Sequence, residues 1–191
     1  MIRTEIFIGI LLSASLIAQS ACSRYTRPDY SNLPPEEAYL IGNVPFFPEK
    51  DHLCGPASLQ ALFGFWNVPV TREEIANAVF LPQIRGAFNF DLVNFARSRG
   101  FQTEEPDGSI DRIERTVRSN RPVIAFLNLG TALFPLGHYV VIIGYDHRKK
   151  ELIFHSGQNE FERMTYSRFD AQWESTNRWM LILLPPGEKN G

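Results

Sequence analysis

The period of the hydrophobic pattern changes near the middle of the chain, and this change restricts the folds that the chain can adopt. Between Cys54 and Trp66, apolar residues recur at the spacing of an α-helix. After residue 121 the apolar residues form continuous runs rich in strand formers, at Pro122–Leu129 and at His138–Tyr145. Helices followed by antiparallel strands predict an α+β domain, with N-terminal helices packed on a C-terminal antiparallel sheet.

Local signals predict the individual helices of the first half. Thr71 and Glu74 have the spacing of a capping box, which predicts a short helix to about Val79. The other predicted helices run over Cys54–Trp66, from Asn89 or Asp91 as the cap to Arg99, and over Ser109–Ser119. Gly100 is the expected stop of the helix that runs to Arg99.

The second half of the chain predicts strands with one further helix. Glu151–His155 follows the apolar run His138–Tyr145 after the polar turn Asp146–Lys150, so we expect these two segments to form a β-hairpin. Ser167–Trp173 predicts a short helix, and Arg178–Leu184 predicts a final strand that ends before two prolines.

Composition excludes several classes of protein. The chain has 191 residues, 44% of them hydrophobic and 13% aromatic, which is enough apolar material for one ordinary domain and argues against disorder. Two cysteines cannot form a disulfide scaffold at this length. The formal net charge is −2 and no basic run occurs, so we expect no nucleic-acid partner.

The N-terminus is predicted to lie outside the folded domain. Arg3 precedes the apolar run Ile6–Ile17, and small or polar residues lead to Cys22, as in a secretory signal peptide over residues 1–21. The pattern resembles a bacterial lipoprotein signal, which implies a lipid on Cys22, although it departs at Gln19 and Glu5. An ordinary signal peptide with an incidental thiol is the alternative.

A lipidated Cys22 would place the protein in the bacterial cell envelope, at an outer membrane or on a periplasmic face. We expect residues 22–43 to be the lipidated N-terminus and a tether, residues 44–186 to be the folded domain, and residues 187–191 to be a tail. Three prolines in the polar segment after Cys22 favour the tether.

Cys54 is the candidate for chemistry, because it stands where a helix is predicted to begin. The positive end of a helix favours the reactive thiolate, and a cysteine nucleophile needs a base, usually a histidine. Of the four histidines, His138 is best placed, since it follows Gly137 at the start of an apolar strand; the others are His52, His147 and His155. A buried structural thiol with an unrelated histidine is the alternative.

The remaining motifs predict structure more than chemistry. The histidines are scattered and no glycine-rich phosphate loop occurs, so we expect no metal and no cofactor. Gly130–Leu136 could form a lip beside His138. The aromatic residues at helical positions are predicted to be core, and they are Phe63, Phe65, Trp66, Phe88, Phe90 and Phe95; Trp173 and Trp179 are expected to pack the last helix and strand.

Several segments together resemble a known family. Val44–Pro48, the run Cys54-Gly-Pro-Ala-Ser-Leu, the run Gly137-His138-Tyr-Val-Val-Ile-Ile-Gly-Tyr and the closing Trp179–Pro186 are similar to the bacteriocin-processing (double-glycine leader) cysteine peptidases and their stand-alone relatives. The resemblance covers Val44 to Pro185. It implies a papain-like fold, Cys54 as the nucleophile and His138 as the base that later protonates the leaving amine.

Two supporting positions depart from the family pattern. Relatives have a glutamine that helps the oxyanion hole before the cysteine, and here the matching residue is Glu49, whose charge would oppose the oxyanion. Relatives orient the histidine with Asp or Asn, and here that position falls near Ser156, with Asn159 as a possible substitute.

These observations leave three hypotheses for the function. The first is an envelope-anchored cysteine peptidase that cleaves a peptide or protein precursor, with a link to an export system left open. The second is a peptide-binding module on the same fold, weakened in catalysis by Glu49 and Ser156. The third is an acyl transferase or amidase that uses the same Cys54 thioester.

Overall fold

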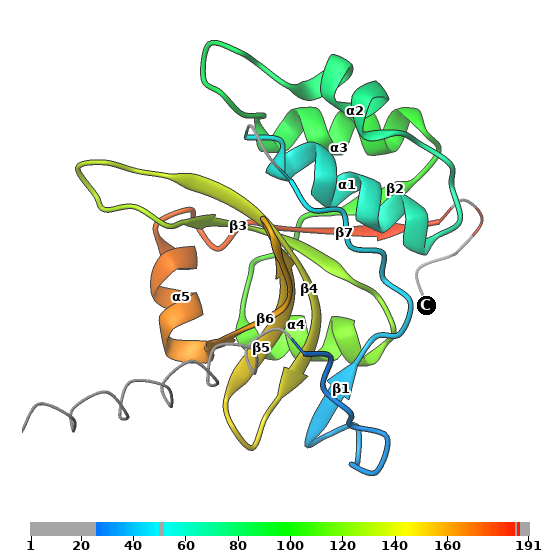
Figure 1. Ribbon diagram of the computed structural model, residues 1–191, viewed down its shortest axis with the longest axis vertical. Helices are drawn as coiled ribbons and strands as arrows, with labels where there is room; N and C mark the ends of the chain where they lie inside the picture. Colours follow the sequence, from blue (N-terminus) through cyan, green and yellow to red (C-terminus); the bar gives the residue numbers. More distant parts are fainter. Residues whose placement is uncertain (1–25, 50–51, 186, 188–191) are drawn as a thin grey trace, which may run out of the picture.

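The computed structural model describes residues 26–49, 52–185 and 187. The predicted signal peptide over residues 1–21, the lipidation site Cys22 and most of the predicted tail lie outside these residues. Figure 1 shows the helices α1, α2 and α3 grouped on one side of strands β3 and β7, with α4 and α5 on the other side of those strands. None of the helices in the described part of the chain has the length and hydrophobicity needed to span a bilayer.

Five α-helices are described. Their bounds are α1 Cys54–Phe65, α2 Arg72–Val79, α3 Asn89–Ser98, α4 Ile110–Arg118 and α5 Tyr166–Glu174. The Thr71 hydroxyl accepts the backbone N–H of Glu74 at 3.2 Å, which confirms the predicted cap of α2. The capping prediction for α3 was wrong, because its N-cap is Phe88, which makes no side-chain cap. Asp91 instead lies in the first turn, where its charge favours the helix.

The strands form one antiparallel sheet, as the sequence predicts. Their bounds are β1 Ala38–Leu40, β2 Gln102–Glu104, β3 Val123–Asn128, β4 Gly137–Asp146, β5 Glu151–Ser156, β6 Asn159–Thr165 and β7 Met180–Leu184. The strand order is β2-β7-β3-β4-β5-β6, and β1 pairs with the C-terminal end of β4. Residues 139–146 of β4 are all buried, which explains why its sequence is a continuous apolar run without alternation.

The folded domain begins before the boundary expected at Val44. In β1, Ala38 pairs with Asp146 and Leu40 pairs with Gly144. Ala38 and Ile41 are each only 2% exposed, and Ile41 belongs to the hydrophobic core. Residues 38–43 are therefore part of the folded sheet and its edge, and any tether ends N-terminal to them.

Candidate active site

The first turn of α1 holds the Cys54 thiol in a partly buried position. Leu53 is the N-cap and its carbonyl accepts the N–H of Ala57 at 2.9 Å, so the helix starts directly at Cys54. The N–H groups of Cys54 and Gly55 have no partner earlier in the helix, and they provide backbone hydrogen bonds that lower the pKa of the thiol. Cys54 is a free cysteine.

The helix start does not make Cys54 acidic, which corrects the expectation drawn from its position. Burial raises the pKa of the Cys54 thiol above its usual value, and the charge of Glu49 adds to this effect. A backbone hydrogen bond from Tyr139 and those of the first turn act in the opposite direction without overcoming burial. The resting thiol is therefore protonated at neutral pH, and a base is needed to generate the thiolate.

His138 lies near the start of β4 and contacts Ser156 at the end of β5. The His138 Nε2 atom is 3.0 Å from Ser156 Oγ, within hydrogen-bond distance. This contact fixes the plane of the imidazole and leaves Nδ1 available for another group. Burial lowers the pKa of His138, so the ring is neutral at pH 7 and able to accept a proton. Ser156 thus occupies the orienting position that the sequence suggests.

Asn159 is not the orienting residue. It pairs with Ser156 across the β5–β6 turn, but its side-chain amide donates to Glu162 Oε2 at 3.1 Å.

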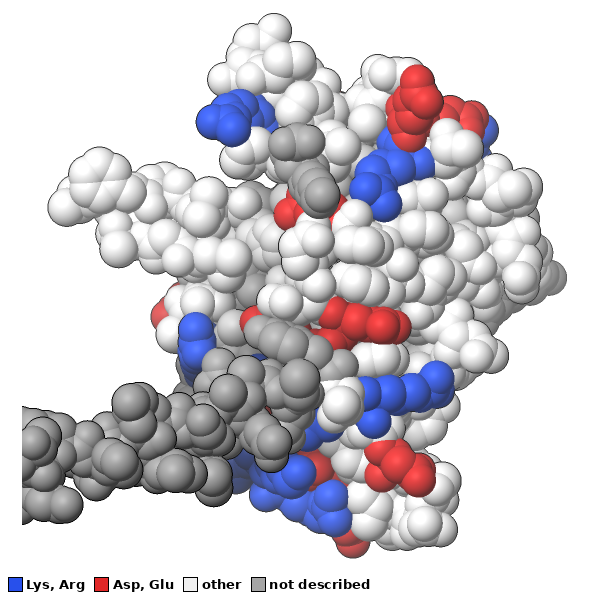
Figure 2. All heavy atoms as spheres, viewed as in Figure 1, with Lys and Arg blue, Asp and Glu red and all other residues white. Residues whose placement is uncertain are grey.

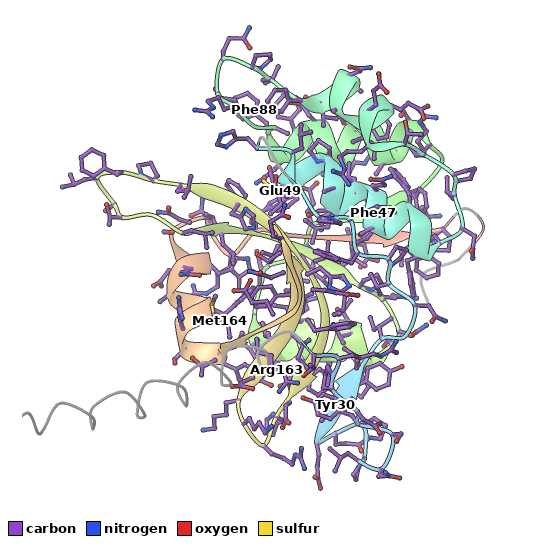
Figure 3. All side chains as sticks on the ribbon, in the orientation of Figure 1. Tyr30, Phe47, Glu49, Phe88, Arg163 and Met164 are labelled. Carbon is purple, nitrogen blue, oxygen red and sulfur yellow. The ribbon has the colours of Figure 1, made fainter. Side chains whose placement is uncertain are left out.

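Cys54 and His138 line one cleft of about 730 Å³. Glu49 and His52 also line it, together with the loop of residues 84–88 and the end of the β3–β4 hairpin. Figure 3 shows Glu49 beside the start of α1, with Phe88 above it on the loop before α3. The fold therefore gathers Cys54, His138 and Glu49 around a single opening, although they come from three distant parts of the sequence.

The Glu49 carboxylate is partly buried and incompletely bonded. Its Oε2 atom is buried with no hydrogen-bond partner among the described residues. The backbone of Glu49 is held by the β5–β6 turn, since its N–H donates to the Gly157 carbonyl at 3.0 Å and Gln158 donates to its carbonyl. A small cavity of about 20 Å³ adjoins the site and is lined by Glu49, Cys54 and Ser156 among others. The carboxylate therefore faces the same space as the thiol.

The other histidines have different environments. His155 is buried beside the small cavity, its Nε2 lies 3.3 Å from the Val44 carbonyl, and burial lowers its pKa to about 4. His147 is exposed in the β4–β5 turn, as the sequence suggests, and contacts Glu114. Across the described residues, no three His, Cys, Asp or Glu side chains lie close enough together to hold a metal ion.

The connection between β3 and β4 frames one side of the mouth of the cleft. Residues 129–136 connect β3 to β4, and the N–H of Leu129 donates to the Leu136 carbonyl at 2.8 Å, so the connection continues the hairpin. Leu133 and Phe134 at its tip are 85% and 79% exposed. Figure 2 shows this tip projecting from the body without any charged side chain. The expected lip beside His138 is therefore an apolar hairpin tip.

The aromatic residues predicted to be core divide into two groups. Phe63 and Phe95 are buried and in contact, but Phe88, which lines the cleft, and Phe90, which stacks on it, are 47% and 59% exposed. Helical spacing could not distinguish these positions, because both residues precede or begin α3. The sequence also gave no signal for Tyr139, whose backbone contacts the thiol while its ring packs under α1.

Comparison with known proteins agrees with this architecture. Residues 41–180 match the model of the Peptidase_C39 like family. A structure assigned as a C39-like peptidase from Bacillus anthracis aligns with a TM-score of 0.64 and 18% identity, over 80% of this chain and 100% of that one. Among curated proteins, none matches the chain significantly.

Two transporter-derived peptidase structures are also similar. The peptidase domain of Streptococcus ComA, a bifunctional ABC transporter of a quorum-sensing pathway, aligns with a TM-score of 0.59 and 21% identity, over 75% of this chain and 99% of that one. A double-glycine motif protease of an AMS/PCAT transporter, solved with its leader peptide, aligns with a TM-score of 0.54 and 17% identity, over 75% and 92%. The fold is thus that of papain-like C39 peptidases, and the chain belongs to the Peptidase_C39 like family.

Proposed function

We propose that the protein is a cysteine peptidase that hydrolyses a peptide bond in a peptide or protein precursor. The hydrogen-bond contact of 3.0 Å between His138 and Ser156, beside a cleft that also contains Cys54, carries this proposal. It supplies an oriented neutral base that lines the same cleft as a protonated thiol, and thiol hydrolysis needs both groups.

The proposed reaction has two stages. His138 takes the proton of Cys54 as the sulfur attacks the substrate carbonyl, and the imidazolium then protonates the leaving amine as the carbon–nitrogen bond breaks. The resulting thioester on Cys54 is hydrolysed by water, which yields the carboxylic acid and restores the thiol. Ser156 holds the imidazole in its orientation during both proton transfers.

Mass spectrometry of the protein during turnover tests this chemistry. With a peptide ester as substrate, we expect an acyl group on Cys54, followed by release of the acid; Cys54→Ala and His138→Ala should abolish turnover. A protein that binds peptides but never forms the acyl adduct would contradict the proposal. Transfer of the acyl group to an added amine in preference to water would favour an acyl transferase.

A peptide-binding role is the second candidate, and the Glu49 carboxylate favours it. A negative charge beside the thiol opposes both the thiolate and the oxyanion that forms on attack. Isothermal titration with peptides can separate the two roles, because a binding module would retain affinity while turnover is undetectable in both the natural protein and Glu49→Gln.

The proposed location is the bacterial cell envelope, with a lipid on Cys22 as the anchor. The sequence before Cys22 supports it, through its apolar run and small residues near the cleavage point. Fractionation of cells that make the full chain should place the protein in membranes, and Cys22→Ala should release it. Membrane retention of Cys22→Ala would contradict lipidation.

A further inference from the structure

A pocket of about 390 Å³ adjoins the cleft on the side of α3, and its walls are mainly aromatic. It shares part of its lining with the cleft, including the rings of Phe88 and Tyr139. We call it the aromatic side pocket, and its five rings belong to Phe88, Phe90, Phe126, Tyr139 and Trp179.

Contacts between the rings hold the pocket in shape. The ring centroids of Phe126 and Tyr139 lie 4.5 Å apart, and Trp179 meets Tyr139 edge-on at 5.9 Å. Phe88 and Phe90 are nearly parallel, with centroids 5.8 Å apart. The rings of Phe126, Tyr139 and Trp179 are thus held before any ligand arrives, so little ordering of these three is required on binding.

Among the described residues that line the pocket, the only charged side chain is a carboxylate, which accepts hydrogen bonds. The Glu105 carboxylate is on its wall, where Oε2 accepts the indole N–H of Trp179 at 2.9 Å. The Tyr139 hydroxyl lies 3.1 Å from the Ala87 carbonyl and 2.7 Å from Asn89 Oδ1, so its single proton is already engaged by these acceptors and is not available to a ligand.

The charge around the pocket is negative. None of the eight residues that line it is a lysine or arginine. Asp91 lies in the first turn of α3 and offsets the positive end of that helix. Burial raises the pKa of the Tyr139 hydroxyl, and the charge of Asp91 adds to this effect. Arg97 approaches Glu105 Oε1 only to 3.9 Å, and its side chain is 56% exposed, so it competes weakly for that carboxylate.

We propose that the aromatic side pocket binds the cationic side chain of a lysine or arginine in the peptide substrate. Ring faces and a carboxylate together attract a cation, whereas an apolar side chain would satisfy only the rings. This inference rests on the proposed peptidase function, and it makes a basic residue close to the scissile bond the feature that the protein selects.

A binding assay tests the pocket independently of catalysis. The indole N–H resonance of Trp179, assigned by Trp179→Phe, is followed by NMR while Nα-acetyl-lysine amide or its neutral counterpart Nα-acetyl-norleucine amide is added to the full chain. We expect saturable shifts with the lysine compound and about tenfold weaker binding of the norleucine compound. Equal binding of both compounds, or no shift with either, would overturn the proposal.

Variants that remove single charges test the role of the Glu105 carboxylate in the same assay. Glu105→Gln should weaken lysine binding up to about fivefold, the value of one partly exposed ion pair, and leave norleucine binding unchanged. The control Glu104→Gln removes an equal charge at the neighbouring residue, which does not line the pocket, and should change neither. Arg97→Gln should strengthen lysine binding, because it removes the competing cation. An unchanged lysine affinity in Glu105→Gln would refute the role of the carboxylate.

Cleavage assays separate this inference from the proposed function. Peptides that carry lysine or norleucine at successive positions around one bond are compared by kcat/KM, and lysine should be favoured at one position in the natural protein but not in Glu105→Gln. If peptides are cleaved without this preference, the pocket proposal fails and the peptidase stands. If none is cleaved but Trp179 still responds selectively to lysine, the peptidase proposal fails and the cation site stands.

Discussion

Replacement of Glu49 by glutamine should convert a carboxylate that opposes catalysis into a donor that assists it. The Oε2 atom of Glu49 is buried without a partner in the described part of the chain, so the substitution removes no hydrogen bond of that atom. The glutamine amide could donate to the oxyanion that forms when Cys54 attacks. One such donor is typically worth about 10²–10³ in kcat, or about 2.7–4 kcal/mol. We therefore expect kcat to rise by up to about three orders of magnitude.

The same substitution should change the acidity of the thiol. The negative charge of Glu49 helps to raise the pKa of Cys54, so Glu49→Gln should lower that pKa and leave more thiolate at neutral pH. The rate of alkylation by iodoacetamide, measured from pH 6 to 10, should then reach its midpoint at a lower pH than in the natural protein.

A matched control distinguishes a local effect from a change in net charge. Glu73→Gln, on the exposed surface of α2 and outside the lining of the cleft, removes the same charge and should alter neither kcat nor the alkylation profile. If Glu49→Gln leaves both measurements unchanged, Glu49 does not face the reacting atoms and the reasoning is refuted.

Three further predictions concern the site and its support. Ser156→Ala removes the contact with His138 and should lower kcat/KM about 2- to 13-fold, the value of one neutral hydrogen bond. Ser156→Asn should recover part of this loss. If kcat/KM of Ser156→Ala equals that of the natural protein, Ser156 has no role in the mechanism. Because burial raises the pKa of Cys54, alkylation of the folded protein should have its midpoint above that of the urea-unfolded chain, near pH ~8.5, and a lower midpoint would contradict the assignment. Gly137→Ala would place a methyl group 2.5 Å from the Phe126 ring, so urea denaturation should show a loss of about 1–3 kcal/mol; unchanged stability would show that the ring moves freely.

The sequence predicts the elements whose stability comes from their own residues. The helical spacing after Cys54 and the cap at Thr71 are local signals, and α1 and α2 begin where those signals place them. The strands β2 and β6 gave no such signal, because they are polar segments at the two edges of the sheet. Strand β1 lies in the segment predicted to be the tether, because three residues carry too little pattern to predict a strand.

The same contrast between local signals and tertiary structure applies to the candidate active site. The resemblance to C39 peptidases predicts Ser156 near His138, and the two side chains are in hydrogen-bond contact. The position of Cys54 at a helix start predicts a thiol with a low pKa. That suggestion was wrong because the helix end is a local effect, whereas burial depends on how β4 and the residues around Glu49 cover the sulfur. The aromatic side pocket could not be predicted, because its rings come from separate elements that only the tertiary fold unites.

The two ends of the central strand β4 lie near different features of the molecule. Its C-terminal end pairs with β1, the described element nearest to Cys22 in sequence, and its N-terminal end carries His138. The eight-residue separation between His138 and Asp146 corresponds to about 27 Å of strand. Figure 1 accordingly shows β1 at one end of the molecule and the β3–β4 hairpin toward the other.

With the proposed lipid on Cys22, β4 would act as a rigid spacer between the anchor and the candidate active site. Arg27 and Pro28 already line one pocket with residues 38–40, so at most about 18 Å of chain separates Cys22 from the β1 end of the domain. The proposed lipid would therefore hold that end close to the bilayer. The cleft would then open away from the lipid surface, toward the aqueous compartment. Substrates would be expected to arrive as dissolved chains, and not as segments emerging from the membrane that carries the anchor.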